Sequence, residues 1–304
     1  MTGSPHHVFV TGFARSGTTL LARLLDAQPN VVCASDAYAA PLDTARDVGG
    51  FRVALSSAQR NRALARHRRS LEGRGFATRI GPDAFTTAGE FYRLALGELA
   101  RPGDVIVGHK FPGHGPHTAV FERILTETEV RCVVVLRDAR DVMLSQSHAL
   151  PDTAIDPDSW RSAARRLRAL RGHPRLVVVR YEDLVRDPPH ALAPVAQLLG
   201  VPLTTDLREL ARDGRPWRDN SSFHDVEMLF DPRPMERWRE HTRDPIVRFA
   251  AWWCADELAR WGYAQFPESF AWRERARFAR ATAVRRTLRA ARPWADALRG
   301  LRDP

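Results

Sequence analysis

Lysine is almost absent from this chain of 304 residues. Of its 46 basic residues, Lys110 is the one lysine and all the others are arginines. Chemistry that needs a compact, titratable ammonium group must therefore use Lys110 or the amino terminus, because the guanidinium group of arginine is planar, delocalised and always charged. The position of this single lysine is consequently informative about function.

Cysteine is also scarce, and long uncharged apolar runs are missing. The three cysteines, Cys33, Cys132 and Cys254, are far apart and form no Cys-x-x-Cys pair. This spacing argues against a zinc cluster and favours a reducing compartment. The first apolar stretch, Val8 to Leu25, contains two arginines, so it falls short of the roughly 18 uncharged residues of a membrane helix. Because the amino terminus also lacks the basic region of a signal peptide, we expect a cytoplasmic protein.

Acidic residues are fewer than basic ones, which leaves a net charge of +10. The segment from Arg273 to Pro304 holds ten arginines and three acidic residues, so most of the excess lies there. We predict one domain over residues 1–272 and an arginine-rich helical tail over 273–304. A solvated helix is the favoured interpretation of the tail, and peripheral contact with an anionic surface is the alternative. No nucleic-acid-binding motif accompanies it, so no nucleic-acid partner is expected.

Short β-branched runs alternate with helical patterns along the domain. The predicted strands are His7–Thr11, Val105–His109, Arg131–Leu136 and Leu176–Arg180. The predicted helices are Thr18–Ala27, Thr118–Thr126, Arg140–Ser147, Ser159–Arg171, Ala191–Leu199 and Ile246–Trp261. Strands that are each followed by a turn or a helix are typical of parallel βαβ units. The expected fold class is α/β: a P-loop-like central parallel sheet flanked by helices, with a helical insertion at about 43–100 and a basic helical C-terminal tail.

The first predicted strand leads into the segment Gly12-Phe-Ala-Arg-Ser-Gly-Thr-Thr19, where a helix begins. Such a turn binds anions, because Gly17 allows the backbone to approach closely and the first N–H groups of the helix face the ligand. The spacing is that of G-x-x-x-x-G-K-[ST], but Thr18 stands at the lysine position and Arg15 supplies the cation. An ordinary strand-to-helix turn, capped by Ser and Thr, is the structural alternative.

A second candidate anion site follows the third predicted strand. Arg137 comes directly after this strand, Asp138 can cap the next helix, and Asp141 lies in its first turn. Ser145 lies about two turns along that helix. Ligands of open α/β sheets bind at the carboxyl ends of strands, which favours a binding role for Arg137 and Ser145. A surface ion pair explains Arg137 equally well when this segment is considered alone.

Together these segments resemble the sulfotransferase superfamily, whose members transfer a sulfuryl group from 3′-phosphoadenylyl sulfate (PAPS). Arg15-Ser-Gly-Thr-Thr-Leu20 matches its 5′-phosphosulfate loop, R-S-G-T-T-L, without a mismatch, and Leu136 to Ser145 resembles its 3′-phosphate site, L-R-D-x-R-D-x-x-x-S. The resemblance implies that the 5′ end of PAPS binds to Arg15, Ser16, Gly17, Thr18 and Thr19. It implies that the 3′-phosphate, which ATP lacks, binds to Arg137 and Ser145.

Weaker similarities to the same family follow along the chain. Arg180-Tyr-Glu-Asp-Leu184 resembles an R-Y-E-D-L element, which implies that Tyr181 lies near the nucleotide. Asn220 to Phe223 and the pair Arg237-Trp238 resemble the C-terminal donor-contacting segment of the protein-tyrosine and bacterial branches. The residues implied by that likeness are Ser221, Ser222 and Arg237. Packing at a strand end, helix capping and surface charge are the structural alternatives for these side chains.

Lys110 ends the second predicted strand and precedes Phe111-Pro112. In the family, a lysine at such a position bonds the oxygen that bridges phosphate and sulfate, and a positioned ammonium there stabilises the charge of the departing phosphate. Cytosolic members place a histidine base two residues after this lysine, where this chain has Pro112. Protein-tyrosine members use a glutamate in the loop after the first helix, and Asp36 occupies its register here.

Asp36 is therefore the first candidate for the general base, and a turn-forming role is its structural alternative. His109 is the second candidate, and His114 and His117 follow in the next loop. Neither a carboxylate pair nor a His/Cys cluster is present to hold a metal, so no metal is expected.

The predicted function is sulfuryl transfer from PAPS to a hydroxyl or amine of a small-molecule, glycan or lipid acceptor, with release of adenosine 3′,5′-bisphosphate. A bacterial enzyme fits the resemblance best. The alternatives are an ATP-dependent P-loop-like kinase and a non-catalytic nucleotide or nucleic-acid binder that acts through the basic tail. Thr18 in place of the Walker lysine argues against the kinase, as does the lack of an evident Mg²⁺-binding aspartate after an apolar strand.

Overall fold

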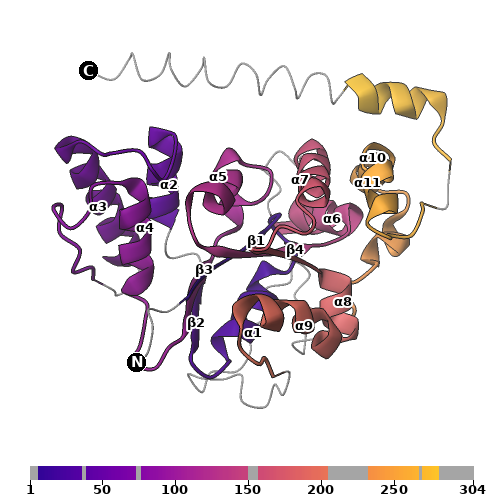
Figure 1. Ribbon diagram of the computed structural model, residues 1–304. Coiled ribbons are helices and arrows are strands. Elements are labelled where there is room, and N and C mark those ends of the chain that lie inside the picture. The colour runs from indigo at the N-terminus through magenta and orange to yellow at the C-terminus, as the bar shows by residue number, and fades with distance from the viewer. Residues whose placement is uncertain are drawn as a thin grey trace.

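Five parallel strands form the centre of the protein, as a computed structural model shows (Figure 1). The structure describes residues 6–35, 39–72, 77–149, 157–204, 232–266 and 269–280. The strands are β1 (His6–Gly12), β2 (Val31–Ser35), β3 (Ile106–Lys110), β4 (Arg131–Leu136) and β5 (Leu176–Arg180), in the order β2-β3-β1-β4-β5. Val10 of β1 lies opposite both Lys110 and Val133, so the carboxyl ends of β3, β1 and β4 lie side by side.

Helices cover both faces of the sheet because its strands are apolar on both sides. One face packs Val8 and Val10 against α1 (Thr18–Asp26), α8 (Tyr181–Arg186) and α9 (Pro188–Leu199), which begins at the Asp187 cap. The other face, which includes Phe9, is covered by α5 (Ala119–Glu127), α6 (Ala139–Ala149) and α7 (Pro157–Ala169). Figure 1 shows the sheet between these two layers.

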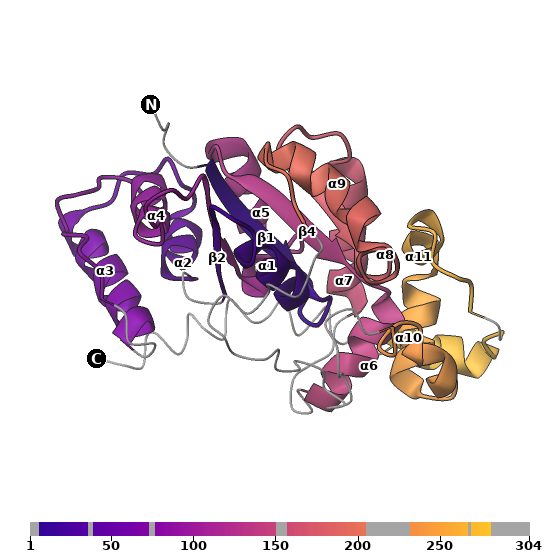
Figure 2. The ribbon, with the colours of Figure 1, turned by 90° about the horizontal axis from the view of Figure 1, so that it is seen from below.

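A helical insertion separates β2 from β3, at about the place (43–100) where the sequence predicts helices. It consists of α2 (Ala39–Val48), α3 (Ser57–Glu72) and α4 (Ala88–Gly97), and it lies beyond the β2 edge of the sheet (Figure 2). A small core of its own, which includes Leu64, Phe85 and Phe91, holds α3 against α4. A capping box of Thr87 and Glu90 fixes the start of α4.

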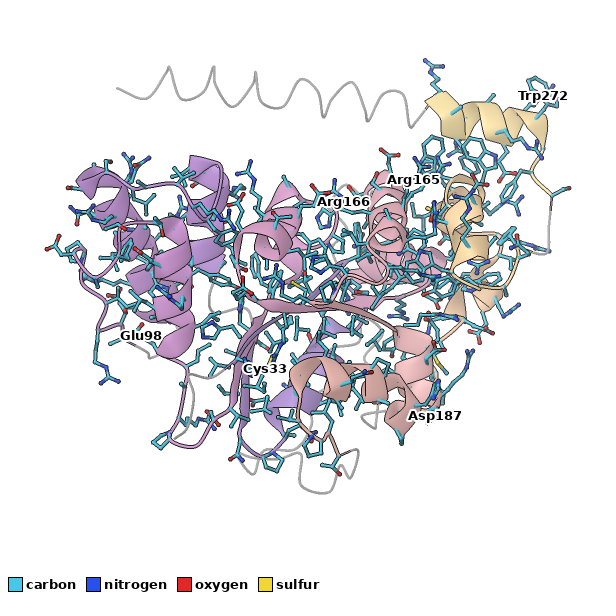
Figure 3. All side chains as sticks on the ribbon, in the orientation of Figure 1. Cys33, Glu98, Arg165, Arg166, Asp187 and Trp272 are labelled. Carbon is cyan, nitrogen blue, oxygen red and sulfur yellow. The ribbon has the colours of Figure 1, made fainter. Side chains whose placement is uncertain are left out.

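The described C-terminal part packs against α6 and α7. It contains the short helix η3 (Arg237–His241), α10 (Pro245–Trp253) and α11 (Ala255–Arg260); the continuous helix predicted from Ile246 to Trp261 is thus interrupted at Cys254. A further helix over 272–280 lies on α10 through Phe278, whose ring centroid is 5.1 Å from that of Phe249. Trp272, at its start, is 73% exposed (Figure 3).

Strand β2, helix α8 and the short helix η3 are absent from the sequence-based prediction, and α8 begins directly at the end of β5 with no turn residue between them. Apart from the break at Cys254, the predicted strands and helices are confirmed to within a few residues, and β3 extends to Lys110. The short helix η1 (Pro112–His114), which the sequence does not predict either, follows β3. In the described part of the chain, no helix is both long and apolar enough to cross a bilayer.

Candidate active site

The loop between β1 and α1 adopts a conformation that turns the backbone sharply into the helix. Arg15 and Gly17 both have positive φ, at 73° and 94°. Ser16 stabilises this turn, because its hydroxyl donates to the carbonyl of Phe13 over 2.5 Å. Gly17 is the N-cap of α1 and has no side chain with which to cap it. The first amides of α1 and its helix dipole therefore face the loop, as an anion site requires.

Arg15 connects this loop to the second predicted anion site. Its Nε donates to the Ser145 hydroxyl of α6 over 3.1 Å. Gln146, the next residue of α6, donates to the carbonyl of Ala14 over 3.0 Å. The two segments that the sequence predicts to bind opposite ends of one donor are thus joined by direct hydrogen bonds, although 130 residues separate Arg15 from Ser145.

Arg137 lies at the centre of the same region and is almost fully buried. One terminal nitrogen donates to the carbonyl of Arg15 over 3.1 Å, and the other donates to the carbonyl of Pro234 over 2.6 Å. Its guanidinium carbon lies 4.6 Å from the centre of the Tyr181 ring, a cation–π arrangement. Tyr181 also packs closely under Gly17, where a Cβ atom would overlap its ring. Arg137 is therefore a fixed buried cation rather than a surface ion-pair partner.

Lys110 is the last residue of β3 and is only 4% exposed. Along β3, Lys110 shares the α1 face of the sheet with Ile106. The next residue, Phe111, is held at β1: its N–H donates to Val10, and its carbonyl accepts from the Thr11 hydroxyl over 3.0 Å. These bonds fix the end of β3 beside the start of the loop that contains Arg15.

Asp36 lies outside the described residues, but its neighbour does not. Ser35, the last residue of β2, lies directly opposite Lys110 in the parallel register. The chain therefore continues into Asp36 from the position paired with Lys110, and the general-base assignment stays a prediction. Ser221 and Ser222 also lie outside the described part of the chain.

His109 is a core residue, which argues against its predicted role as a base. It alternates with Lys110 along β3 and so belongs to the opposite face of the sheet. Its exposed fraction is 0%, and its ring lies 5.0 Å from that of Phe9 and 5.6 Å from that of Tyr92. In this structure the ring is therefore enclosed by the core and is not open to an acceptor at the strand ends. His117 instead packs edge-on against Phe13 of the loop, and the side chain of His114 is not among those described.

A network of buried charges beneath Arg137 was missed by sequence reasoning, which treated Asp138 and Asp141 as helix-capping residues. Asp138 receives two side-chain hydrogen bonds from Arg140, and Glu182 accepts the N–H of Asp138 and the hydroxyl of Tyr263. Burial raises the pKa of Asp141 to about 7 and also raises that of Glu182, whereas the charge of Arg137 acts in the opposite direction on both. The concentration of charge in Arg-Asp-x-Arg-Asp at a strand end is the sequence signal for this network.

Arg237 lies at the start of η3, partly buried and three residues after Pro234, whose carbonyl accepts from Arg137. Among the described residues, no group of three or more His, Cys, Asp or Glu side chains is arranged to hold a metal ion.

Comparisons with known proteins agree with this geometry. The model of the sulfotransferase family matches residues 5–206. The sulfotransferase domain of the olefin synthase from Synechococcus PCC 7002 is similar in structure, with a TM-score of 0.52, 19% identity, and coverage of 92% of this chain and 95% of that domain. The sulfotransferase domain from the curacin biosynthetic pathway aligns with a TM-score of 0.54 and 14% identity, covering 86% of this chain and 99% of that domain. A search of curated proteins finds no match.

The two structural likenesses establish the fold, and the family model establishes membership because it spans more than half of the chain. The R-S-G-T-T-L loop lies within the matched residues. This protein therefore belongs to the sulfotransferase family and is a sulfuryl-transferring enzyme.

Proposed function

We propose that the donor is PAPS and that it binds along the carboxyl ends of β1 and β4, with Lys110 beside its reacting group. The observation that carries this proposal is the direct connection of two anion-binding segments through Arg15, Ser145 and Arg137. A donor with phosphate groups at both its 5′ and its 3′ positions is complementary to two such sites held at a fixed separation.

The residues present fit the 5′ end of PAPS. The α1 N-terminus begins at a glycine cap, so its first amides and the helix dipole favour an anion. Arg15 is in the same loop, and Thr18 and Thr19 supply hydroxyls in the first turn of α1. A Walker lysine is missing, and Lys110 of the adjacent strand is the ammonium group closest in the sheet to this loop. This set suits a phosphosulfate better than a triphosphate with Mg²⁺.

The 3′ end of PAPS would be held by Arg137 and Ser145. Arg137 donates to two carbonyls through its terminal nitrogens, and a guanidinium group with five N–H donors retains hydrogens for a phosphate. Its position over the Tyr181 ring fixes the plane of these donors. Arg237, Ser221 and Ser222 are the further proposed contacts with the donor.

Lys110 would act on the leaving group. When bound, PAPS supplies a sulfuryl group linked to the 5′-phosphate through a bridging oxygen. The ammonium of Lys110 stabilises the negative charge that develops on this oxygen as the sulfur–oxygen bond breaks. The new bond forms between sulfur and the acceptor oxygen or nitrogen, and the acceptor proton passes to the base, for which Asp36 is proposed.

Replacement of Asp36 by asparagine tests the base. We expect the rate of transfer to fall by about 10²-fold or more, because general-base catalysis contributes about that much, while the affinity for adenosine 3′,5′-bisphosphate stays within about twofold. Transfer is measured with labelled donor, and affinity by calorimetry. His117→Gln is the matched control and should retain the wild-type rate. A large loss in His117→Gln with a small one in Asp36→Asn would assign the base to the histidine loop instead.

The acceptor is proposed to be a small molecule, a glycan or a lipid with a free hydroxyl or amine. The helical insertion α2–α4 begins three residues after Asp36, so it is the part of the protein that would wall the acceptor site. We further infer a bacterial cytoplasmic enzyme, in line with the low cysteine content. An acceptor screen with labelled donor, followed by mass spectrometry for one added sulfuryl group, identifies the substrate.

Nucleotide binding separates the proposed donor from ATP. Adenosine 3′,5′-bisphosphate should bind to the protein at least about 10-fold more tightly than ATP–Mg²⁺, because Arg137 and Ser145 contribute only to a 3′-phosphate. Calorimetry with each nucleotide measures this, and addition of a chelator should leave the binding of the bisphosphate unchanged. Tight binding of ATP–Mg²⁺ without binding of the bisphosphate would refute the PAPS proposal and favour a kinase.

A further inference from the structure

The chain returns to the donor site through a segment beyond the part matched by the family model. Residues 232–241 lie against the start of α6 and are fastened there by hydrogen bonds. The Pro234 carbonyl accepts from Arg137. The two carboxylate oxygens of Asp141 accept backbone N–H groups, one from Glu236 over 2.8 Å and one from Trp238 over 2.9 Å. Arg237 is the residue between these two bonds.

Both neighbours of Arg237 are also held in other ways. Glu236 has a φ of 54°, a left-handed conformation that is unfavourable for a non-glycine residue and persists only where its surroundings impose it. The ring of Trp238 is buried under Arg140, whose guanidinium carbon lies 3.6 Å from the ring centre. Asp138 fixes Arg140 in turn through two side-chain hydrogen bonds. The backbone at Arg237 therefore has little freedom while Asp141 holds it.

The position of Asp141 on α6 relates this clamp to the donor site. Asp141 and Ser145 are four residues apart in the helix, so they lie one above the other on the same face. Ser145 is the residue that Arg15 contacts. The Asp141 clamp thus holds Arg237 about one helical turn from Ser145.

A buried carboxylate is an energetically unfavourable group with which to hold this segment in place. Asp141 is 2% exposed, and Asp138 and Glu182 place further negative charge nearby, with Arg137 as the compensating cation. Burial raises its pKa to about 7, so the ionisation of Asp141 reduces folding stability as the pH rises toward that value. Carboxyl groups whose pKa values are perturbed in this way cluster at functional sites.

We propose that Asp141 is a positioning residue, which holds Arg237 beside Ser145 so that Arg237 contacts the 3′-phosphate of the donor. This inference rests on the proposed function, in which that phosphate binds at Arg137 and Ser145. Asp141 itself contacts no donor atom. Its contribution to binding is made through Arg237 and is specific for nucleotides that carry a 3′-phosphate.

The test compares Asp141→Asn with the wild type at pH 8. Asparagine has the same shape, but its amide nitrogen opposes one of the two N–H groups that the carboxylate accepts. We expect the affinity for adenosine 3′,5′-bisphosphate to fall by about 10-fold or more, and that for adenosine 5′-monophosphate by less than about twofold. Arg237→Ala should produce the same pattern. In the double variant, Asp141→Asn should cause no further loss.

Controls separate positioning from loss of structure. Glu257→Gln changes another fully buried carboxylate, one that pairs with Arg168 of α7, and should leave both affinities unchanged. The wild-type Asp141 carboxyl stabilises the fold at low pH, and this contribution is lost as the pH rises toward about 7, because its folded pKa lies above the unfolded value. The melting temperature of Asp141→Asn, taken relative to that of the wild type at the same pH, should therefore be higher at pH 8 than at pH 5.

Different results would overturn different statements. Equal weakening of both nucleotides by Asp141→Asn, or additive losses in the double variant, would show that Asp141 does not act through Arg237. If the wild type itself does not prefer the bisphosphate over the monophosphate, the proposed donor is wrong. If Asp141→Asn does not fold, Asp141→Glu is measured in the same way; it keeps both acceptor oxygens but displaces the segment, and it should weaken the bisphosphate selectively.

Discussion

Replacing Lys110 with alanine should slow sulfuryl transfer by about 10²–10³-fold while changing the affinity for the PAPS donor by less than about threefold. The reason is that the charge on the bridging oxygen develops only as its bond to sulfur breaks, so an ammonium beside it stabilises the transition state more than the bound, intact donor. Rates are measured with labelled donor at saturation, and affinities by calorimetry. An unchanged rate would remove Lys110 from the chemistry.

Two further variants show whether the shape of lysine matters as well as its charge. Lys110→Arg keeps the positive charge but replaces a compact ammonium with a planar group, and it should recover little of the lost rate. Lys110→Met keeps the length of the side chain without the charge and controls for packing, because this residue is only 4% exposed. Recovery by Lys110→Arg to near the wild-type rate would mean that any cation serves at this position. The scarcity of lysine elsewhere in the chain would then be incidental.

Gly17→Ala is expected to weaken donor binding by about 10²-fold or more. It is also expected to destabilise the fold by about 1–3 kcal/mol. An alanine here must adopt a φ of 94°, and its Cβ would overlap the Cδ2 atom of Tyr181 and lie 2.8 Å from Cε2. The ring cannot move aside easily, because it is buried beneath the Arg137 guanidinium. Urea unfolding and calorimetry measure the two effects.

Gly200→Ala is the matched control for the strain alone. Gly200 also has a positive φ, 71°, as the C-cap of α9, but an added Cβ there meets no atom within 4 Å. This variant should lose about 1 kcal/mol of stability and keep the wild-type affinity for the bisphosphate. If Gly17→Ala retains donor binding, the loop between β1 and α1 does not contact the donor as proposed.

The predictions that depend on local sequence agree with the structure. Four strands, the first loop with its helix, and the helical insertion follow from runs and turns of fewer than about 20 residues, where periodicity and glycine placement are informative. The sequence does not predict strand β2, because Val31 to Ser35 is a strand by virtue of its pairing with β3. Helix α8 was missed for a related reason, since Tyr181 continues a β-like run and yet begins a helix.

The candidate site divides in the same way. Arg15, Arg137, Ser145 and Lys110 could be named from motifs, because each motif is a strand end followed by a helix start, and this arrangement is encoded locally. The burial of His109 could not be predicted from a motif, because a residue at a strand end can belong to either face of the sheet until the register is known. The hydrogen bonds from Glu236 and Trp238 to Asp141 could not be predicted either, because about 95 residues separate Asp141 from them in the sequence.

By itself, the sequence determined that this protein has an R-S-G-T-T-L loop of the sulfotransferase type and a single lysine, and it predicted a second anion site after the third predicted strand and a leaving-group role for that lysine. Only the tertiary structure decided which residues meet: that Arg15 contacts Ser145, that Lys110 ends its strand opposite Val10 and Ser35, and that Asp141 holds the segment containing Arg237. The physical reason is that strand order, register and buried charge networks are set by long-range packing. No window of sequence contains both partners of such contacts.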